Sequence, residues 1–250
     1  MTDLTLLHPA ANPHPAAPGM VTAMGGFPKS DLPLFLAGYS ELCRCDLNGG
    51  VAIEICGGHG HLAAEVANVF PEAQVIGLDL YAATGPDIDA AKIRCPNLSY
   101  VAGDAFDLSR YADESVDLIW GQAALHHLAH DPQKLSREVL RVLKPGGRLV
   151  FIFEPMGHNF AVAAIRAVRM ARHELGDESN LYLSQFQRML TCGFSQCDVQ
   201  MFNLLGYPMK ALSDRFVSIT KVIHQLDARL FATWPGLLRY GANCNVIFTK

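Results

Sequence analysis

The sequence has no run of lysine and arginine, and its 20 basic residues are outnumbered by 24 acidic ones, which leaves a formal net charge of −4 at pH 7. A protein that binds a polyanion needs a positive patch or stripe to gather it. We therefore expect neither DNA nor RNA as a partner and look for a small-molecule substrate instead.

Paired cysteines are also absent. The seven cysteines are an odd number and none of them forms a CxxC pair, so we expect no disulfide framework and propose no metal site. Cys43 and Cys45 lie closest together. We interpret them as reduced thiols near a helix end, with binding of a soft metal or metalloid as the alternative.

Long apolar runs are missing as well. Residues 1–7 have neither the basic start nor the apolar stretch of a secretion signal, and no run approaches the ~18 apolar residues that cross a bilayer. We expect a cytoplasmic protein without a membrane span. Its 250 residues fit one α/β domain with a small added segment, and a homodimer is left open.

Proline is concentrated at the N-terminus, where six of the 14 prolines lie within the first 33 residues. This predicts extended or mobile chain that serves as a tail or a lid. Ser30 or Asp31 can then cap a helix with Pro33 in its first turn. The apolar side of this helix consists of Leu34, Phe35, Tyr39 and Leu42. We expect residues 1–46 to form the proline-rich segment and covering helix, and residues 47–250 to form the main domain.

From Asn48 onward, short β-rich runs alternate with helical stretches, which is the pattern of a parallel sheet with crossover helices. The predicted strands are residues 51–56, 74–80, 98–102, 116–120, 148–153, 198–204 and 243–248. Asp131 begins a helix between the fourth and fifth of these strands. Helical insertions are expected around residues 156–192 and 206–240.

Two of the later helices carry a recognisable pattern. In the helix expected over residues 160–173, one side has arginine at every third position, and we interpret it as a solvated face. These arginines are Arg166, Arg169 and Arg172. The next helix has apolar residues at spacings of three and four, which predicts a stripe that packs in the core. The stripe consists of Leu212, Phe216, Ile219, Ile223, Leu226 and Leu230.

A glycine-rich turn, Glu54-Ile55-Cys56-Gly57-Gly58-His59-Gly60, follows the first strand of the main domain. Open α/β sheets bind ligands where a strand ends against a helix N-terminus, and glycine lets a ligand lie against bare backbone. The turn also fits the GxGxxG/A dinucleotide pattern, with Asp79 placed to hold ribose hydroxyls. On these two features alone, NAD and S-adenosylmethionine are nearly tied.

Two further acids favour S-adenosylmethionine. Glu54, just before the turn, can accept a hydrogen bond from a cationic amino group, but it would be a poor neighbour for a pyrophosphate. Asp104 follows the third strand and can accept from the exocyclic amine of adenine.

These residues resemble the motifs of the Rossmann-like, class I S-adenosylmethionine-dependent methyltransferases, in which an acid with a glycine loop, a second-strand acid and a third-strand aspartate recur in that order. The resemblance continues in residues 115–120, 124–128 and 140–149. The chain is similar to the branch that contains the ubiquinone and menaquinone biosynthesis methyltransferases and many small-molecule methyltransferases. The family's fold is an α/β, three-layer αβα sandwich whose mostly parallel, seven-stranded sheet has an antiparallel last strand, with added helical cap elements.

The resemblance also implies which residues hold the cofactor and its product, S-adenosylhomocysteine. They are Glu54, Cys56, Gly58, Gly60, Asp79, Leu80, Asp104, Ala105 and Gly121. Glu54 and the glycine turn would hold the methionine part, Asp79 the ribose, and Asp104 with Ala105 the adenine. Cys56 stands where the family usually has its first glycine, which fits if its backbone angles are ordinary.

Methyl transfer from a sulfonium is an in-line displacement, so the protein mainly aligns the acceptor and excludes water. A hydroxyl acceptor also benefits from a base, and the candidates are His126 and His127, just beyond the fourth strand. Glu154 and His158, at and after the end of the fifth strand, are expected to face the acceptor. The flanking segments are expected to close over the site, a cover that fits an apolar, low-molecular-weight acceptor.

The leading hypothesis is a small-molecule methyltransferase that acts on oxygen or carbon. One alternative is a NAD-dependent oxidoreductase. Another is a protein of the same fold that binds S-adenosylmethionine but catalyses a cyclisation or rearrangement, or serves as a binding subunit. A metalloid methyltransferase that depends on Cys43 or Cys45 is a further alternative.

Overall fold

The computed structural model describes residues 4–8, 31–81, 84–174, 178–206 and 217–250. It contains an eight-stranded sheet made of β1 (Leu4–Leu7), β2 (Val51–Ile55), β3 (Gln74–Asp79), β4 (Leu98–Ala102), β5 (Val116–Gln122), β6 (Leu143–Pro155), β7 (Gln196–Phe202) and β8 (Asn243–Thr249). The strand order is β1-β7-β8-β6-β5-β2-β3-β4.

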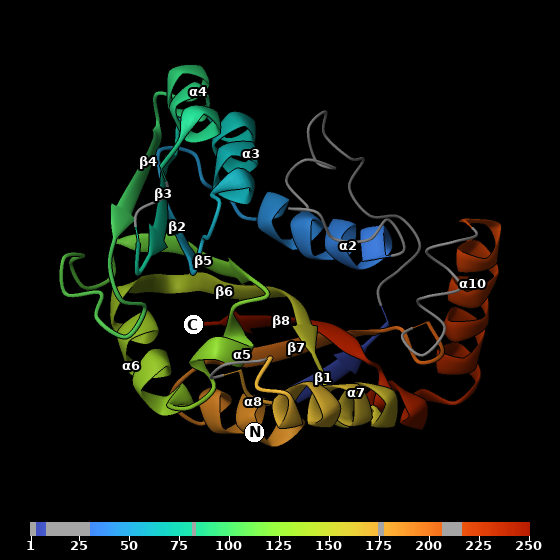
Figure 1. Ribbon diagram of the computed structural model, residues 1–250. Helices are drawn as coiled ribbons and strands as arrows, with labels where there is room; N and C mark the ends of the chain where they lie inside the picture. Colours follow the sequence, from blue (N-terminus) through green and yellow to red (C-terminus); the bar gives the residue numbers. More distant parts are fainter. Residues whose placement is uncertain (1–3, 9–30, 82–83, 175–177, 207–216) are drawn as a thin grey trace.

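Helices cover both faces of this sheet (Figure 1). They are α2 (Leu32–Cys43), α3 (His61–Val69), α4 (Pro86–Arg94), α5 (Leu125–Leu128), α6 (Pro132–Val142), α7 (Phe160–Ala171), α8 (Leu183–Leu190) and α10 (Val217–Thr233), followed by the 3-10 helix η2 (Pro235–Tyr240). Helices α2, α3 and α4 pack in the core on one face, and α6 and α8 pack in the core on the other. This is the predicted αβα sandwich. Within the described part of the chain, no helix has the length and apolar character to cross a membrane.

All seven predicted strands are present, and the N-terminus adds an eighth. β1 pairs in parallel with β7, with Leu4 opposite Cys197. We expected only a tail or a lid here, so the predicted strand count was one too low. The strand forms because Leu4 and Leu6 pack against the core while Thr5 and Leu7 face outward. The remainder of the proline-rich segment, residues 9–30, lies outside the described residues.

The central strands β3, β2 and β5 run parallel, so their carboxyl ends meet at one edge of the sheet. All three are largely buried, as expected of a parallel sheet with helices on both faces. β8 is antiparallel to both of its neighbours, β6 and β7, which confirms the predicted antiparallel last strand. β4 also runs parallel to β3. Glu54, Asp79 and Asp104 therefore lie at or near the same edge of the sheet.

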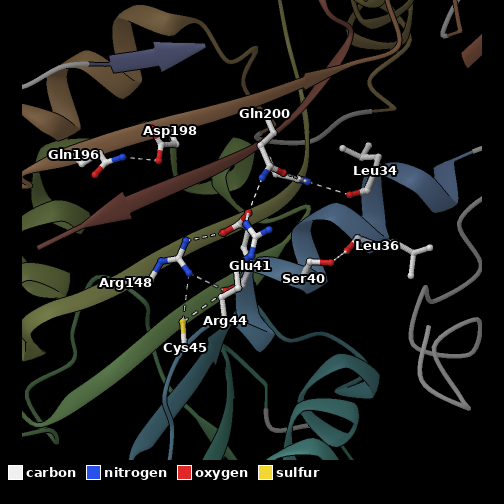
Figure 2. Close-up of polar contacts among 11 residues, drawn as sticks. Leu34, Leu36, Ser40, Glu41, Arg44, Cys45, Arg148, Gln196, Asp198 and Gln200 are labelled. Carbon is white, nitrogen blue, oxygen red and sulfur yellow. Dashed lines mark hydrogen bonds and ion pairs between the residues drawn. The ribbon is translucent and has the colours of Figure 1, made fainter. Parts of the chain in front are cut away.

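The covering helix α2 has the predicted apolar side, with Leu34, Phe35, Tyr39 and Leu42 all buried. It also makes polar contacts with the sheet through Glu41 (Figure 2). Glu41 Oε2 pairs with Arg148 Nη2 of β6 at 2.8 Å, and Glu41 Oε1 accepts from Gln200 Nε2 of β7 at 2.8 Å. Asp31 precedes the helix without capping it through its side chain.

Two predictions about the later helices need correction. Arg166 of α7 is buried and bonded to neighbouring loop residues, so it does not belong to a solvated face. In α10, Ile223 is buried as expected, whereas Leu226 is 44 % exposed. Leu212 and Phe216, also assigned to that stripe, lie outside the described residues.

Loss of Arg148 should cost more stability than loss of an exposed arginine, because Arg148 pairs with the buried Glu41. In Arg148→Met, the buried Glu41 carboxylate loses its more buried cation and keeps only Arg44, whose side chain is 66 % exposed. We therefore expect unfolding to become easier by about 2 kcal/mol or more. Arg169→Met is the control, because Arg169 and its partner Glu174 are both about half exposed and such pairs contribute less than about 1 kcal/mol. Urea denaturation measures both changes, and equal losses would contradict this account.

Candidate functional site

A cavity of about 880 Å³ opens at the carboxyl edge of β2 to β5, a size that accommodates a cofactor. Of the predicted site residues, those that line it are Cys56, Asp79, Leu80, Asp104, Ala105 and His127. Gly58 lines an adjoining hollow of about 400 Å³ that shares Asp79. The predicted residues that line neither space are Glu54, Gly60, Gly121, His126, Glu154 and His158.

The glycine turn between β2 and α3 has a left-handed backbone at three positions. Cys56, Gly58 and Gly60 have φ values of 54°, 50° and 69°. The condition under which a cysteine fits at position 56, ordinary backbone angles, is not met. The cysteine occupies a conformation that suits glycine, at a cost of roughly 1–2 kcal/mol. At Gly60 a Cβ atom would lie 2.2 Å from the Tyr100 ring, whose hydroxyl donates to Gly60 O at 2.7 Å.

Asp79 is the last residue of β3, and it both bonds to the glycine turn and lines the cavity. Its Oδ2 accepts from Gly58 N at 2.9 Å, and its Oδ1 accepts from Tyr81 N at 3.3 Å. These bonds fix the carboxylate in place. Because a carboxylate has about four acceptor positions, Asp79 can still accept from the hydroxyls of a ligand.

Asp104 follows β4 and is held by a short turn. Its Oδ1 accepts from Phe106 N at 2.9 Å, which orients the carboxylate at the cavity wall. Ala105 and Phe106 are buried beside it and give the cavity an apolar surface. Phe106 was not predicted as a site residue, although its position two residues after Asp104 could have suggested it.

Glu54 lies beneath the turn and is 2 % exposed. Its Oε2 accepts from Ala63 N in the first turn of α3 at 3.1 Å, and its Oε1 accepts from Trp120 Nε1 at 3.2 Å. Burial raises the pKa of Glu54 to about 8. In this geometry Glu54 positions the start of α3, and direct contact with the methionine part of a cofactor stays a prediction.

Leu80 and Gly121 occupy very different surroundings. Leu80 is 67 % exposed at the cavity, where its apolar side chain is available to a ligand. Gly121 is buried in β5, and a Cβ there would lie 2.7 Å from Ala124 Cβ and 3.0 Å from Ile55 O. Close packing of β5 against its neighbours therefore requires glycine at this position.

Glu154 lies fully buried near the end of β6 and holds the start of α5. Its Oε1 accepts from Ala124 N and Leu125 N, each at 2.8 Å. Its Oε2 accepts from His126 N at 3.2 Å and lies 2.8 Å from His126 Nδ1. Both oxygens of Glu154 thus bond to the start of α5 and to the His126 ring, and its predicted contact with an acceptor stays a prediction.

The two histidines of α5 differ in exposure. His126 is buried, whereas His127 is exposed and lines the cavity. Partial burial, together with the neighbouring His126, lowers the pKa of His127. On the far side of His126, Nε2 lies 3.9 Å from Glu178 Oε2, which pairs with Arg166 Nη1 at 3.1 Å. Glu178 and Arg166 were not recognised as site residues from the sequence.

His158 lies away from the cavity lining. Its Nε2 accepts from Leu183 N at the start of α8 at 3.3 Å, and its ring packs edge-on against Tyr182. Burial, with a smaller effect of Arg239, lowers the pKa of His158. This geometry gives His158 a structural partner, and its predicted contact with an acceptor stays a prediction.

Part of this chain is similar to known methyltransferases. Residues 53–151 match the methyltransferase domain family. The chain is 36 % identical over 108 residues to a phthiotriol/phenolphthiotriol dimycocerosates methyltransferase of Mycobacterium leprae, covering 43 % of this chain and 39 % of that protein. It is 31 % identical over 103 residues to a ubiquinone/menaquinone biosynthesis C-methyltransferase of Dinoroseobacter shibae, covering 40 % of each. These matches span about two fifths of each relative.

A solved structure shows a similar fold over a larger part of the chain. It is phosphoethanolamine N-methyltransferase 2 of Haemonchus contortus in complex with S-adenosyl-L-methionine, with a TM-score of 0.58 and 19 % identity over 86 % of this chain and 51 % of that one. The chain thus has the fold of the class I S-adenosylmethionine-dependent methyltransferases. Its residues 53–151 match the methyltransferase domain family, which confirms the resemblance found in the sequence.

The raised pKa of Glu54 predicts a pH dependence of stability. The folded protein keeps the Glu54 proton up to about pH 8, whereas the unfolded chain releases it near pH 4.3. Between these values the folded state binds more protons, so the free energy of unfolding falls as pH rises. Glu54→Gln cannot ionise, and its stability should fall less between pH 5 and pH 8. Denaturation at each pH tests this, and parallel curves for the two proteins would contradict it.

Two glycines of the turn form a matched pair for substitution. Both have positive φ, but a Cβ at Gly58 meets nothing within 4 Å, whereas one at Gly60 overlaps the Tyr100 ring. Gly58→Ala should cost roughly 1–2 kcal/mol from backbone strain alone. Gly60→Ala should cost a further 1–3 kcal/mol or so from steric overlap. Equal melting temperatures for the two variants would rule out the contact with Tyr100 as the cause.

Proposed function

We propose that this protein binds S-adenosylmethionine in the cavity of about 880 Å³ and transfers its methyl group to an oxygen or carbon of a small, largely apolar metabolite. The observation that carries the proposal is the placement of Asp79 and Asp104 on one cavity wall beside the glycine turn. The methyltransferase domain match and the fold shared with a methyltransferase bound to S-adenosyl-L-methionine support it.

Each part of the cofactor would have a partner in this cavity. Asp104 can accept from the adenine amine, with the apolar wall at Phe106 next to the ring, and Asp79 can accept from the ribose hydroxyls. The turn from Cys56 to Gly60 then receives the methionine part. In the transfer, the acceptor donates an electron pair to the methyl carbon as the carbon–sulfur bond breaks, which leaves neutral S-adenosylhomocysteine and releases a proton from a hydroxyl acceptor.

The acceptor would approach from the side of α5, where His127 lines the cavity. Leu128 of α5 contributes apolar surface there, which suits an apolar acceptor. The predicted cover from the N-terminal segment and from residues 206–240 lies partly outside the described residues. His126 and His127 stay the predicted groups for handling the acceptor's proton.

The competing functions make different predictions for the same cavity. A NAD-dependent oxidoreductase would hold a pyrophosphate beside the turn, and the match of residues 53–151 to the methyltransferase domain favours methyl transfer instead. A protein that binds S-adenosylmethionine without transferring its methyl group would form no S-adenosylhomocysteine. Detection of this product during turnover with candidate acceptors separates the two uses of the cofactor.

Calorimetric titration with S-adenosylhomocysteine, S-adenosylmethionine and NAD tests the cofactor site. Asp79→Ala and Asp104→Ala should each weaken binding of both adenosyl ligands by about tenfold or more, because each variant loses a hydrogen bond to a charged group. Asp107→Ala is the control, since this acid is exposed and does not line the cavity. Binding of NAD alone, or equal binding by all three variants, would contradict the proposal.

A further inference from the structure

Two histidines and a glutamate meet beside the cavity, in an arrangement that could hold a metal ion. A ring nitrogen of His126, a ring nitrogen of His127 and a carboxylate oxygen of Glu178 all lie within 4.8 Å of one another. Bonds of about 2.0–2.2 Å to Zn²⁺ would place such ligands roughly 3.3 Å apart. Small movements of the side chains would therefore close the set around an ion.

The hydrogen bonds of His126 suit it to be a metal ligand. Its Nδ1 lies 2.8 Å from Glu154 Oε2, and because a carboxylate only accepts, Nδ1 carries the proton that it donates. The lone pair of the neutral ring is then on Nε2, which is the nitrogen that faces Glu178 at 3.9 Å. Metal-binding histidines commonly donate their other N–H to a carboxylate in this way, which fixes the ring and its tautomer.

The charges around the cluster also favour a cation. Among the described residues in contact here, Glu154 and Glu178 are carboxylates and Arg166 is the one guanidinium. Arg166 also donates to Asn180 Oδ1 and Ser179 O, so it anchors the loop that carries Glu178. Glu178 pairs with Arg166 through Oε2, the oxygen that also lies 3.9 Å from His126 Nε2, so an ion here would share this carboxylate with Arg166.

The cluster adjoins the methyl-transfer cavity through His127, which is part of the cavity lining. Three protein ligands leave a fourth position around Zn²⁺, as in zinc sites that bind a substrate or water. Two imidazoles and one carboxylate are ligands of the type that Zn²⁺ and similar divalent transition metals use. An ion here would thus have one position open toward the cavity.

We propose that His126, His127 and Glu178 bind one divalent transition-metal ion, such as Zn²⁺, whose open position holds an oxygen atom of the methyl acceptor. The second part of this proposal rests on the proposed function. It deepens that function by restricting the acceptor to molecules with an oxygen ligand at or beside the methylated atom. It also gives the two histidines the role of metal ligands in place of a base.

Titration of metal-free protein with Co²⁺, with no adenosyl ligand present, tests the ion site by itself. We expect visible absorption bands of one Co²⁺ ion bound to nitrogen and oxygen, and Zn²⁺ should displace that ion. His127→Ala and Glu178→Gln should weaken the binding of Zn²⁺ by about tenfold or more, and Glu154→Gln by about 10–100-fold. His130→Ala is the control, because His130 follows α5 but is not part of the cluster.

Several outcomes would overturn the ion site. The first two are no uptake of Co²⁺ or Zn²⁺, and equal uptake by Glu178→Gln and the unmodified protein. The third is the appearance of near-ultraviolet thiolate bands, which would show that a cysteine binds the ion instead. S-adenosylhomocysteine binding by Glu178→Gln shows whether the variant is folded. It also separates failure of the ion site from failure of the proposed function, since the two titrations use different ligands.

Benzohydroxamate tests the open position, because it combines an apolar ring with two oxygen ligands. Added to the Co²⁺-loaded protein, it should shift the visible bands, since its oxygens would enter the coordination sphere. An unchanged spectrum at a saturating concentration of benzohydroxamate would overturn the claim that the ion holds an acceptor oxygen.

Discussion

The carboxylate of Glu154 accepts from three successive backbone N–H groups and from the His126 ring, all at the start of α5. Those N–H groups have no partners within the helix, and the positive end of a helix favours a negative charge. Glu54, which burial keeps protonated up to about pH 8, also accepts a hydrogen bond from the first turn of α3, through Ala63 N. Two buried glutamates, one on β2 and one on β6, thus position the starts of α3 and α5 beside the cavity. The shape of the cavity wall depends on these two contacts.

Much of the cofactor site could be predicted because its signals are local. A buried parallel strand appears as a short apolar run, and the residue that follows it must lie at the carboxyl edge of the sheet. Asp79 and Asp104 were found in this way, and both line the cavity. The same logic placed His127 beside the cavity, because α5 begins directly after β5. Periodicity and order along the chain were sufficient for these residues.

The remaining features depend on contacts between distant parts of the chain. Arg166 was predicted to lie on a solvated face with two other arginines, because helical spacing does not show which segment covers a helix. Its partner Glu178 lies in a separate loop. The strand Leu4–Leu7 was missed because its pairing with β7 involves residues near the opposite end of the sequence. At Cys56 the backbone is left-handed, and a cysteine in the sequence does not predict this conformation, which is typical of glycine.

The central claim is that the carboxyl edge of β2 to β4 holds an adenosyl cofactor. The most direct measurement is a crystal structure of the protein with S-adenosylhomocysteine. The account predicts the adenine beside Asp104, the ribose hydroxyls within hydrogen-bond distance of Asp79, and the homocysteine part against the turn from Cys56 to Gly60. A ligand bound elsewhere, or one turned so that its adenine lies at the turn, would contradict it.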